Sequence, residues 1–231
     1  MVVHAPLRAA GLLVLGGLIA AGCTDFASPA ELTKPTVLAV IAEPPVVAPG
    51  EPTDLTAVIV DGSGELTGLP VRWSLIETYR GVPPMGTLTG STYTAPDPIP
   101  TLPANAPPID SVRLEVDTGA TTLVTVKFVA VAAVALTNPT ISAFTVGAVD
   151  AAAGPITVAR GAVLDLAITT DPPLAADARF AWYSSAGEIV KYQSNPTTMT
   201  AAEDAGAGWL FIVARDGKGG MAWRGVEITV E

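Results

Sequence analysis

The chain repeats one short pattern at a fixed spacing, and this repeat limits the fold more than any other feature of the sequence. Residues 47–55 and 158–166 share the pattern Val-Ala-x-Gly-x-x-x-Asp-Leu at an offset of 111 positions. A second match follows in the same order, because Trp73-Ser74 has a counterpart in Trp182-Tyr183-Ser184. Ordered matches along both halves favour one architecture used twice.

Within each half, apolar side chains alternate with polar ones at the period of two that is typical of β-strands. Residues 112–117 (Val-Arg-Leu-Glu-Val-Asp) place apolar side chains on one face and charges on the other, and residues 226–230 alternate in the same way. Residues 209–213 form a continuous apolar strand, and 216–220 (Asp-Gly-Lys-Gly-Gly) predict a hairpin turn. Helix signals are nearly absent. The sequence therefore predicts an all-β fold of two tandem β-sandwiches.

The N-terminal region ends in the only cysteine of the chain. Arg8 is followed by the apolar stretch 9–21, which leads through Gly22 to Cys23. This order is that of a secretory signal peptide, and the stretch is shorter than the roughly twenty residues of a transmembrane helix. It resembles the lipobox of bacterial lipoproteins, in which the cysteine is acylated and becomes the mature N-terminus. Ala20 departs from the commonest lipobox residue, Leu, and an ordinary signal peptide is the alternative.

The lipobox resemblance implies where the protein is located. We expect a lipid (palmitate-type) membrane anchor at Cys23 and localisation in the cell envelope. Thr24 after the cysteine favours the outer membrane or cell surface, by resemblance to enterobacterial sorting. The resemblance does not specify the membrane leaflet.

Both halves also carry motifs of known modules. Trp73-Ser74, Gly-Thr-Leu-Thr-Gly at 86–90 and Tyr-Thr-Ala-Pro at 93–96 resemble bacterial Ig-like domains. Residues 181–183 and 213–220 are similar to Ig-like and PKD-like modules of bacterial surface proteins. The whole chain resembles cell-surface lipoproteins with two such modules, whose activity is generally unassigned. The resemblance implies a fold and a location, because folds do not determine functions.

These features predict four segments. They are a signal peptide at 1–22, a lipid-anchored tether at 23–34, an Ig-like sandwich at 35–134 and an Ig-like or PKD-like sandwich at 135–231. An extended tether would hold the first sandwich ~35 Å from the lipid. The short connection at 132–139 implies restricted hinge motion. The proline-rich segment 97–108 is expected to be an exposed loop, either a stiff connector or a docking strip for a partner.

Composition excludes several function classes. The formal charge is −10, and residues 1–22 carry one Arg and no acid, so their removal makes it −11. Such a charge, without a basic cluster, argues against nucleic acid and against electrostatic binding to anionic lipid. The only histidine, His4, lies in the signal peptide. Imidazole catalysis and histidine metal ligation are therefore not expected, and we predict no catalytic residue, cofactor or small-molecule substrate.

Acidic residues lie at several predicted loops, where calcium is the metal to consider. They are Asp61, Asp171, Asp177, Asp204 and Asp216. No calcium-loop motif is present, and turn geometry explains the Asp-Gly pairs, so no metal site is predicted. Calcium at the domain junction stays open.

The four tryptophans fall into two groups. Trp73, Trp182 and Trp209 are expected to fill the sandwich cores. Trp223 shares a face with Glu227, opposite to Val226 and Ile228. Either a bulge at Gly225 shifts the phase, or Trp223 faces outward beside Tyr183 or Tyr192 as a candidate binding surface.

The sequence therefore favours a non-enzymatic envelope protein that acts as a spacer, adhesion or interaction module on a lipid anchor. The alternative is a specific glycan- or protein-binding subunit of an envelope complex. A carboxylate-dependent hydrolase is a more distant third.

Overall fold

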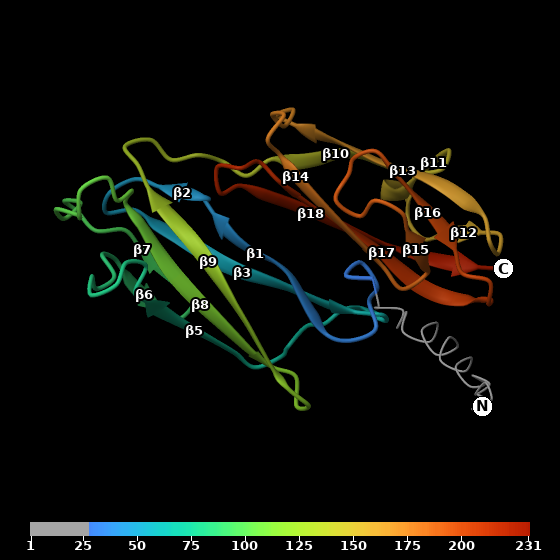
Figure 1. The fold of residues 1–231 in the computed structure, drawn as a ribbon, viewed down its shortest axis with the longest axis horizontal. Helices are drawn as coiled ribbons and strands as arrows, with labels where there is room; N and C mark the ends of the chain where they lie inside the picture. Colours follow the sequence, from blue (N-terminus) through green and yellow to red (C-terminus); the bar gives the residue numbers. More distant parts are fainter. Residues whose placement is uncertain (1–27) are drawn as a thin grey trace, which may run out of the picture.

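The first β-sandwich consists of two sheets built from the N-terminal half of the chain (Figure 1). The structure, a computed structural model, describes residues 28–231. One sheet has the order β1-β3-β7-β6, with β4 paired to β3, and the other has the order β2-β9-β8-β5. The strands are β1 (Thr36–Glu43), β2 (Val46–Val47), β3 (Pro52–Asp61), β4 (Gly64–Glu65), β5 (Val71–Ile76), β6 (Thr87–Thr89), β7 (Thr92–Thr94), β8 (Ile109–Asp117) and β9 (Thr122–Val131).

The second sandwich repeats this arrangement. Its sheets have the orders β11-β10-β13-β16-β15 and β12-β18-β17-β14. The elements are β10 (Thr140–Val146), β11 (Val149–Asp150), the 3₁₀ turn η1 (Ala151–Ala153), β12 (Ile156–Val158), β13 (Val163–Asp171), β14 (Arg179–Ser184), β15 (Gly187–Ile189), β16 (Thr197–Ala201), β17 (Gly206–Arg215) and β18 (Met221–Val230). Strand for strand, β1-β3-β7-β6 corresponds to β10-β13-β16-β15. The prediction of an all-β fold with two tandem sandwiches is confirmed.

The sequence repeat corresponds to one structural element used twice. Val47 of β2 pairs in parallel with Val131 of β9, and Val158 of β12 pairs in parallel with Val230 of β18. Each short strand runs into a tight turn that is closed by a backbone hydrogen bond, Glu51 N to Ala48 O in one half and Ala162 N to Ala159 O in the other. The repeated glycine follows at positive φ, 79° at Gly50 and 63° at Gly161. A side chain at either glycine would be strained, which explains why the pattern requires glycine there.

Each sandwich has its own apolar core. In the second, Trp182 is fully buried and packs against Phe144 at a ring-centroid distance of 5.9 Å. In the first, fully buried Tyr93 and Val112 lie in one cluster and Leu114 in a neighbouring one. Trp73 is only partly buried and packs against both clusters of the first sandwich. Trp182 therefore fills a core as predicted, whereas Trp73 lies at the edge of one.

Residues 132–139 connect β9 to β10, where the sequence predicts the junction of the sandwiches. Residues 97–108 connect β7 to β8 as a mostly exposed loop, as expected. Among residues 28–231, none of the helical segments is long and apolar enough to cross a membrane.

Candidate functional site

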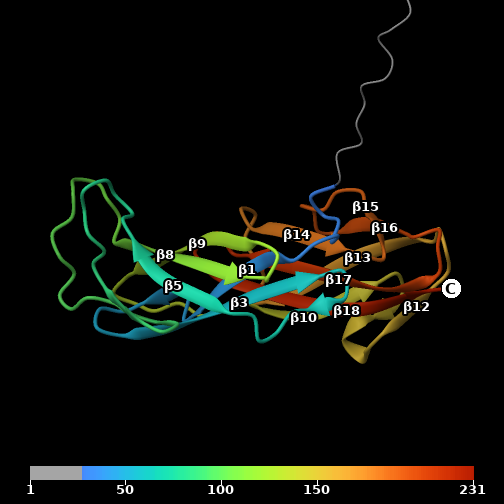
Figure 2. The ribbon, with the colours of Figure 1, turned by 90° about the horizontal axis from the view of Figure 1, so that it is seen from below.

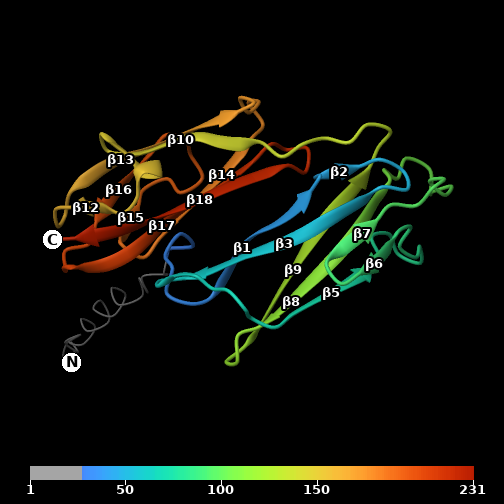
Figure 3. The ribbon, with the colours of Figure 1, turned by 180° about the vertical axis from the view of Figure 1, so that it is seen from behind.

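The two sandwiches share a third apolar cluster, which we call the interdomain cluster. Figures 1 and 3 show β1 and β3 of the first sandwich running beside β17 and β18 of the second. The buried members are Leu32, Leu38, Ala39, Val58, Val60, Phe211 and Val213, and Ile41, Tyr183, Trp209, Met221 and Trp223 pack around them. Burial of such a surface holds the two sandwiches together, because separating them would expose it to water.

This cluster explains why residues 209–213 are apolar without alternation. Leu210 and Ile212 belong to the core of the second sandwich, whereas Phe211 and Val213 belong to the interdomain cluster. Strand β17 is therefore buried on both faces. A strand that is buried on both faces reads as a continuous apolar run.

Trp223 lies in the same interface. The pairing of β17 with β18 runs without a register shift from Gly206↔Val230 to Arg215↔Met221, so the bulge interpretation at Gly225 is wrong. Trp223 points away from the core of its own sandwich, is half-buried, and lies in the same cluster as Tyr183. Its ring centroid is 6.4 Å from that of Phe211. Trp223 is therefore covered on its outward side by the interdomain cluster and does not form an isolated exposed patch.

Two glycines make room for the interface aromatics. A Cβ on Gly225 would lie 2.5 Å from Cε1 of Phe211, so the Phe211 ring packs directly over the backbone of Gly225. A Cβ on Gly64, in the first sandwich, would lie 2.9 Å from Cε2 of Trp209, in the second. Trp209 therefore packs against the opposite sandwich rather than filling its own core, which corrects the expectation from sequence.

Polar contacts add geometric precision to the interface. Arg215 Nη2 donates to Leu38 O at 3.0 Å, and Ser185 Oγ donates to Gly62 O at 2.9 Å. Asn138, in the connecting segment, donates to Ala42 O at 2.7 Å and accepts from Met221 N at 2.8 Å. These directed bonds fix one relative orientation, which the apolar contacts alone would not do.

Lys127 supplies the one buried cation found among residues 28–231. It lies on β9, is only 4% exposed, and its Nζ donates to Gly219 O in the β17–β18 turn at 2.8 Å. Burial lowers the pKa of Lys127 from its ordinary 10.5 to about 8, while the Asp216 carboxylate opposes this shift and Arg215 adds to it. The ammonium group is thus held at a site that disfavours its charge.

We expect the free energy of unfolding to rise between about pH 8 and 10.5 in the natural protein, and this rise to be absent from the Lys127→Met variant. Below about pH 8, Lys127 is protonated in both folded and unfolded chains, so the full burial penalty applies. Between about pH 8 and 10.5, the unfolded chain binds the extra proton, so the stability contributed by this group rises with pH. The rise should be on the order of 2–3 kcal/mol. Urea unfolding of both proteins from pH 7 to 10.5 measures it, and parallel stability curves would contradict this assignment.

The N-terminal segment, residues 28–33, packs on the second sandwich. Ser184 N of β14 donates to Ala30 O at 2.8 Å, and Leu32 N donates to Ser184 O at 3.0 Å. Ala30 is buried in the core of the second sandwich, and Leu32 is buried in the interdomain cluster. The prediction of an extended tether at 23–34 is therefore wrong for residues 28–33. Their alternating apolar side chains, Ala30 and Leu32, are buried beside the edge strand β14.

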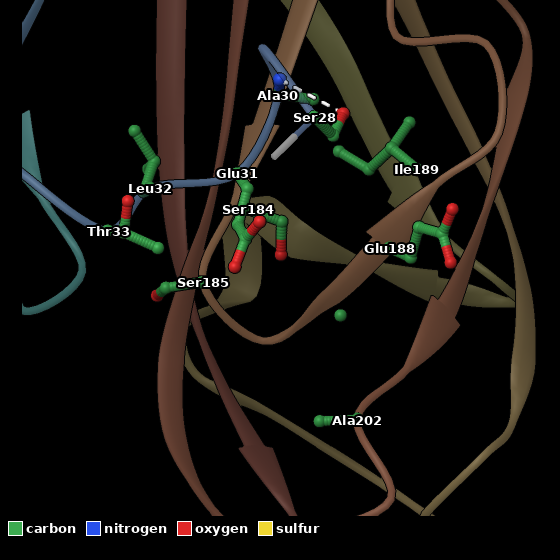
Figure 4. Close-up of a pocket in the computed structure, with 11 residues that line it drawn as sticks. Ser28, Ala30, Glu31, Leu32, Thr33, Ser184, Ser185, Glu188, Ile189 and Ala202 are labelled. Atoms are coloured by element: carbon green, nitrogen blue, oxygen red, sulfur yellow. Dashed lines mark hydrogen bonds between the residues drawn. The ribbon is translucent and has the colours of Figure 1, made fainter. Parts of the chain in front are cut away.

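A groove of about 740 Å³ lies between the N-terminal segment and β15 (Figure 4). Its lining includes the hydroxyl-bearing Ser28 and Ser185, the apolar Ile189, and the carboxylates of Glu31 and Glu188. Both glutamates are exposed. Exposed carboxylates of this kind offer hydrogen-bond acceptors at the surface of the groove.

An exposed apolar stripe runs along β9 on the outer face of the first sandwich. Val124, Val126 and Phe128 are 52%, 40% and 61% exposed. They lie opposite Glu115, Arg113 and Ser111 of β8, respectively. Arg113 and Glu115 form an ion pair with each other at 2.7 Å. This stripe holds the most exposed large aromatic side chain of the described residues, Phe128, which no sequence motif marks.

Asp110 is a further residue that no sequence motif marks. Its side chain is 2% exposed and accepts hydrogen bonds from Met85 N at 3.0 Å, Gly86 N at 2.7 Å and the Tyr93 hydroxyl at 2.8 Å. Burial, together with Asp110, raises the pKa of the Tyr93 hydroxyl far above its ordinary value. Gly86 and Tyr93 belong to the motifs that resemble bacterial Ig-like domains, so Asp110 joins those motifs to β8 for a structural purpose.

We expect Asp110→Asn to destabilise the first sandwich by about 2–3 kcal/mol, because an amide NH₂ would face the donors that the carboxylate now satisfies. Thermal or urea unfolding measures this change. Asp54→Asn is the matched control, since Asp54 is exposed and, within residues 28–231, its side chain accepts a bond from Thr92 Oγ1 alone. Equal stabilities of the two variants would show that Asp110 is not needed for folding.

The acidic side chains of two turns accept hydrogen bonds from backbone N–H groups of the same turn. Asp61 accepts from Ser63 N, and Asp216 accepts from Lys218 N and Gly220 N. Across residues 28–231, no three His, Cys, Asp or Glu side chains are grouped so that they could hold a metal ion. Cys23 and the predicted signal peptide lie outside the described residues.

No protein-family model matches the chain, and no curated protein does. Solved structures do. The tandem Ig repeats of Dlar are 9% identical, with 85% of this chain and 97% of that chain covered, at a TM-score of 0.32. Fibronectin(III)-like modules of Clostridium thermocellum CbhA are 15% identical, with 86% and 94% covered, at 0.31.

A further match is a nucleoside hydrolase-related hypothetical protein from Saccharophagus degradans, 17% identical at a TM-score of 0.33. It covers 42% of this chain, and the matched part spans only 26% of the other protein. With TM-scores below 0.5, these similarities do not indicate a function for this chain.

Proposed function

We propose that this chain is a non-enzymatic, lipid-anchored protein of the cell envelope whose two sandwiches act together as one stiff spacer or interaction module. The observation that carries the proposal is the interdomain cluster, which joins the sandwiches through Val60 and Phe211. Because its hinge motion is restricted, such a module holds its binding surfaces at a defined distance and orientation. The lipid anchor rests on the lipobox resemblance at Cys23.

A second candidate function is a specific binding subunit for a glycan or an envelope protein. The exposed stripe of Val124, Val126 and Phe128 favours it, because contiguous exposed apolar side chains often mark interaction sites. Aromatic rings such as that of Phe128 are common contacts at binding surfaces. A glycan or envelope protein that binds the natural chain but not the Phe128→Ser variant would favour this candidate.

A carboxylate hydrolase is the third candidate, and the groove with Glu31 and Glu188 is the place where it would act. We infer that these exposed carboxylates are solvated surface charges. A turnover on glycan, peptide or ester substrates that disappears in Glu31→Gln or Glu188→Gln would overturn this inference.

The anchor is tested by Cys23→Ser. We expect the natural protein in the membrane fraction, with a mass that shows a lipid-modified Cys23 as the first residue. The variant should be released into the soluble fraction or accumulate as the unprocessed precursor, because serine offers no thiol for acylation. Thr33→Ser, outside the lipobox, serves as a control that should stay in the membrane fraction. An unmodified Cys23 thiol in the purified native protein would contradict the lipoprotein proposal.

A further inference from the structure

The way the N-terminal segment packs decides which surface of the molecule lies near an anchor. Because residues 28–33 are held on β14, only the five residues from Cys23 up to Ser28 separate the proposed anchor from the packed segment. Five residues span at most about 18 Å when fully extended. This reach is about half of what an extended tether as far as Lys34 would provide.

The packed segment lies on the side of the molecule, away from both ends of its long axis (Figures 1 and 2). The loops at 77–86 and 97–108 of the first sandwich lie at one end, and the C-terminus lies at the other (Figure 1). The point from which the chain leads back to Cys23 is therefore a flank of the second sandwich, beside β14 and β15.

We propose that this flank, formed by the N-terminal segment, β14 and β15, faces the lipid bilayer, so that the molecule is anchored by its side and does not stand on its first sandwich. The inference rests on the proposed anchor at Cys23. The partner is the lipid surface itself, and the groove with Glu31 and Glu188 is part of this flank, between the N-terminal segment and β15.

The charged residues of this flank do not determine the orientation of the molecule, so the length of the tether does. Glu31 and Lys34 on and just after the segment, and Glu188 and Lys191 at and beside β15, balance in sign, and Arg179 at the start of β14 adds one positive charge; all five are exposed. Such a surface is not held to anionic headgroups, since strong attraction needs a cluster of basic residues. The flank thus stays close to the bilayer and hydrated.

The experiment uses the chain from Cys23 to Glu231, coupled through its only thiol to maleimide lipids in a supported bilayer. Neutron reflectometry measures the position and thickness of the protein layer. We expect the layer to begin at the headgroups and to be thinner than the long axis of the molecule. A twelve-residue Gly-Ser insertion between Ala27 and Ser28 should move the layer outward, on the order of 20 Å.

Ala30→Asp should act in the same direction, because a buried carboxylate at this position releases the N-terminal segment from β14. Thr33→Ser, on the same segment but exposed and uncharged, should leave the layer unchanged. If the natural chain gave the same profile as the Gly-Ser insertion, which leaves the fold intact, side anchoring would be overturned. Chemical coupling makes this outcome independent of whether cells acylate Cys23, which the Cys23→Ser experiment decides separately.

Discussion

Val60→Asp is expected to separate the two sandwiches while leaving each of them folded. Val60 lies on β3, is fully buried, and belongs to the interdomain cluster rather than to the core of the first sandwich. A carboxylate there loses its hydration without gaining a partner, which should weaken the interface by about 3–5 kcal/mol. When the sandwiches separate, the new carboxylate reaches water and the penalty disappears.

Two measurements detect this separation. Small-angle X-ray scattering should give a larger radius of gyration for Val60→Asp, and proteases should cut the 132–139 connection faster. Val124→Asp is the matched control, since Val124 is a valine of the same sandwich that is 52% exposed. Its scattering and cleavage rate should equal those of the natural protein. An unchanged radius and cleavage rate for Val60→Asp would mean that the cluster does not hold the sandwiches together.

Trp182→Ala should have the largest effect on the second sandwich. The side chain is fully buried, and its Nε1 donates to Ser194 O at 2.8 Å, so the substitution leaves both a cavity and an unpaired carbonyl. We expect a loss of about 3–5 kcal/mol. Trp73→Ala, at the partly buried equivalent position, should lose only about 1–3 kcal/mol. Urea unfolding of each variant compares them, and a Trp73→Ala loss as large as that of Trp182→Ala would contradict the difference in burial.

Local patterns were sufficient to predict the sandwiches themselves. Alternation at 112–117 places Val112, Leu114 and Val116 in the core, and all three are fully buried. The repeated Val-Ala-x-Gly pattern marks the same parallel strand and turn in both halves. Such features depend on neighbours within a strand or a turn, which the sequence displays directly.

Contacts between distant segments could not be derived in this way. Trp223 lies on the strand face opposite to the core residues of its own sandwich, and residues 209–213 are apolar on both faces. These two features indicate a second buried face, but they do not indicate which segment covers it. Ala30 and Leu32 alternate with Glu31 and Thr33, a weak strand signal inside a polar stretch. Asp110 shares its face with Val112, which marks it as inward-facing, yet its donors come from a loop and a strand of another sheet.

The two sandwiches should behave as one stiff unit, and the distribution of distances between them tests this most directly. Spin labels on Ser91→Cys and Thr157→Cys, in a Cys23→Ser background, place one exposed probe on each sandwich. Double electron–electron resonance should give a single narrow distribution for the natural interface and a broad one when Val60→Asp is added. A distribution that is equally broad in both proteins would contradict the claim.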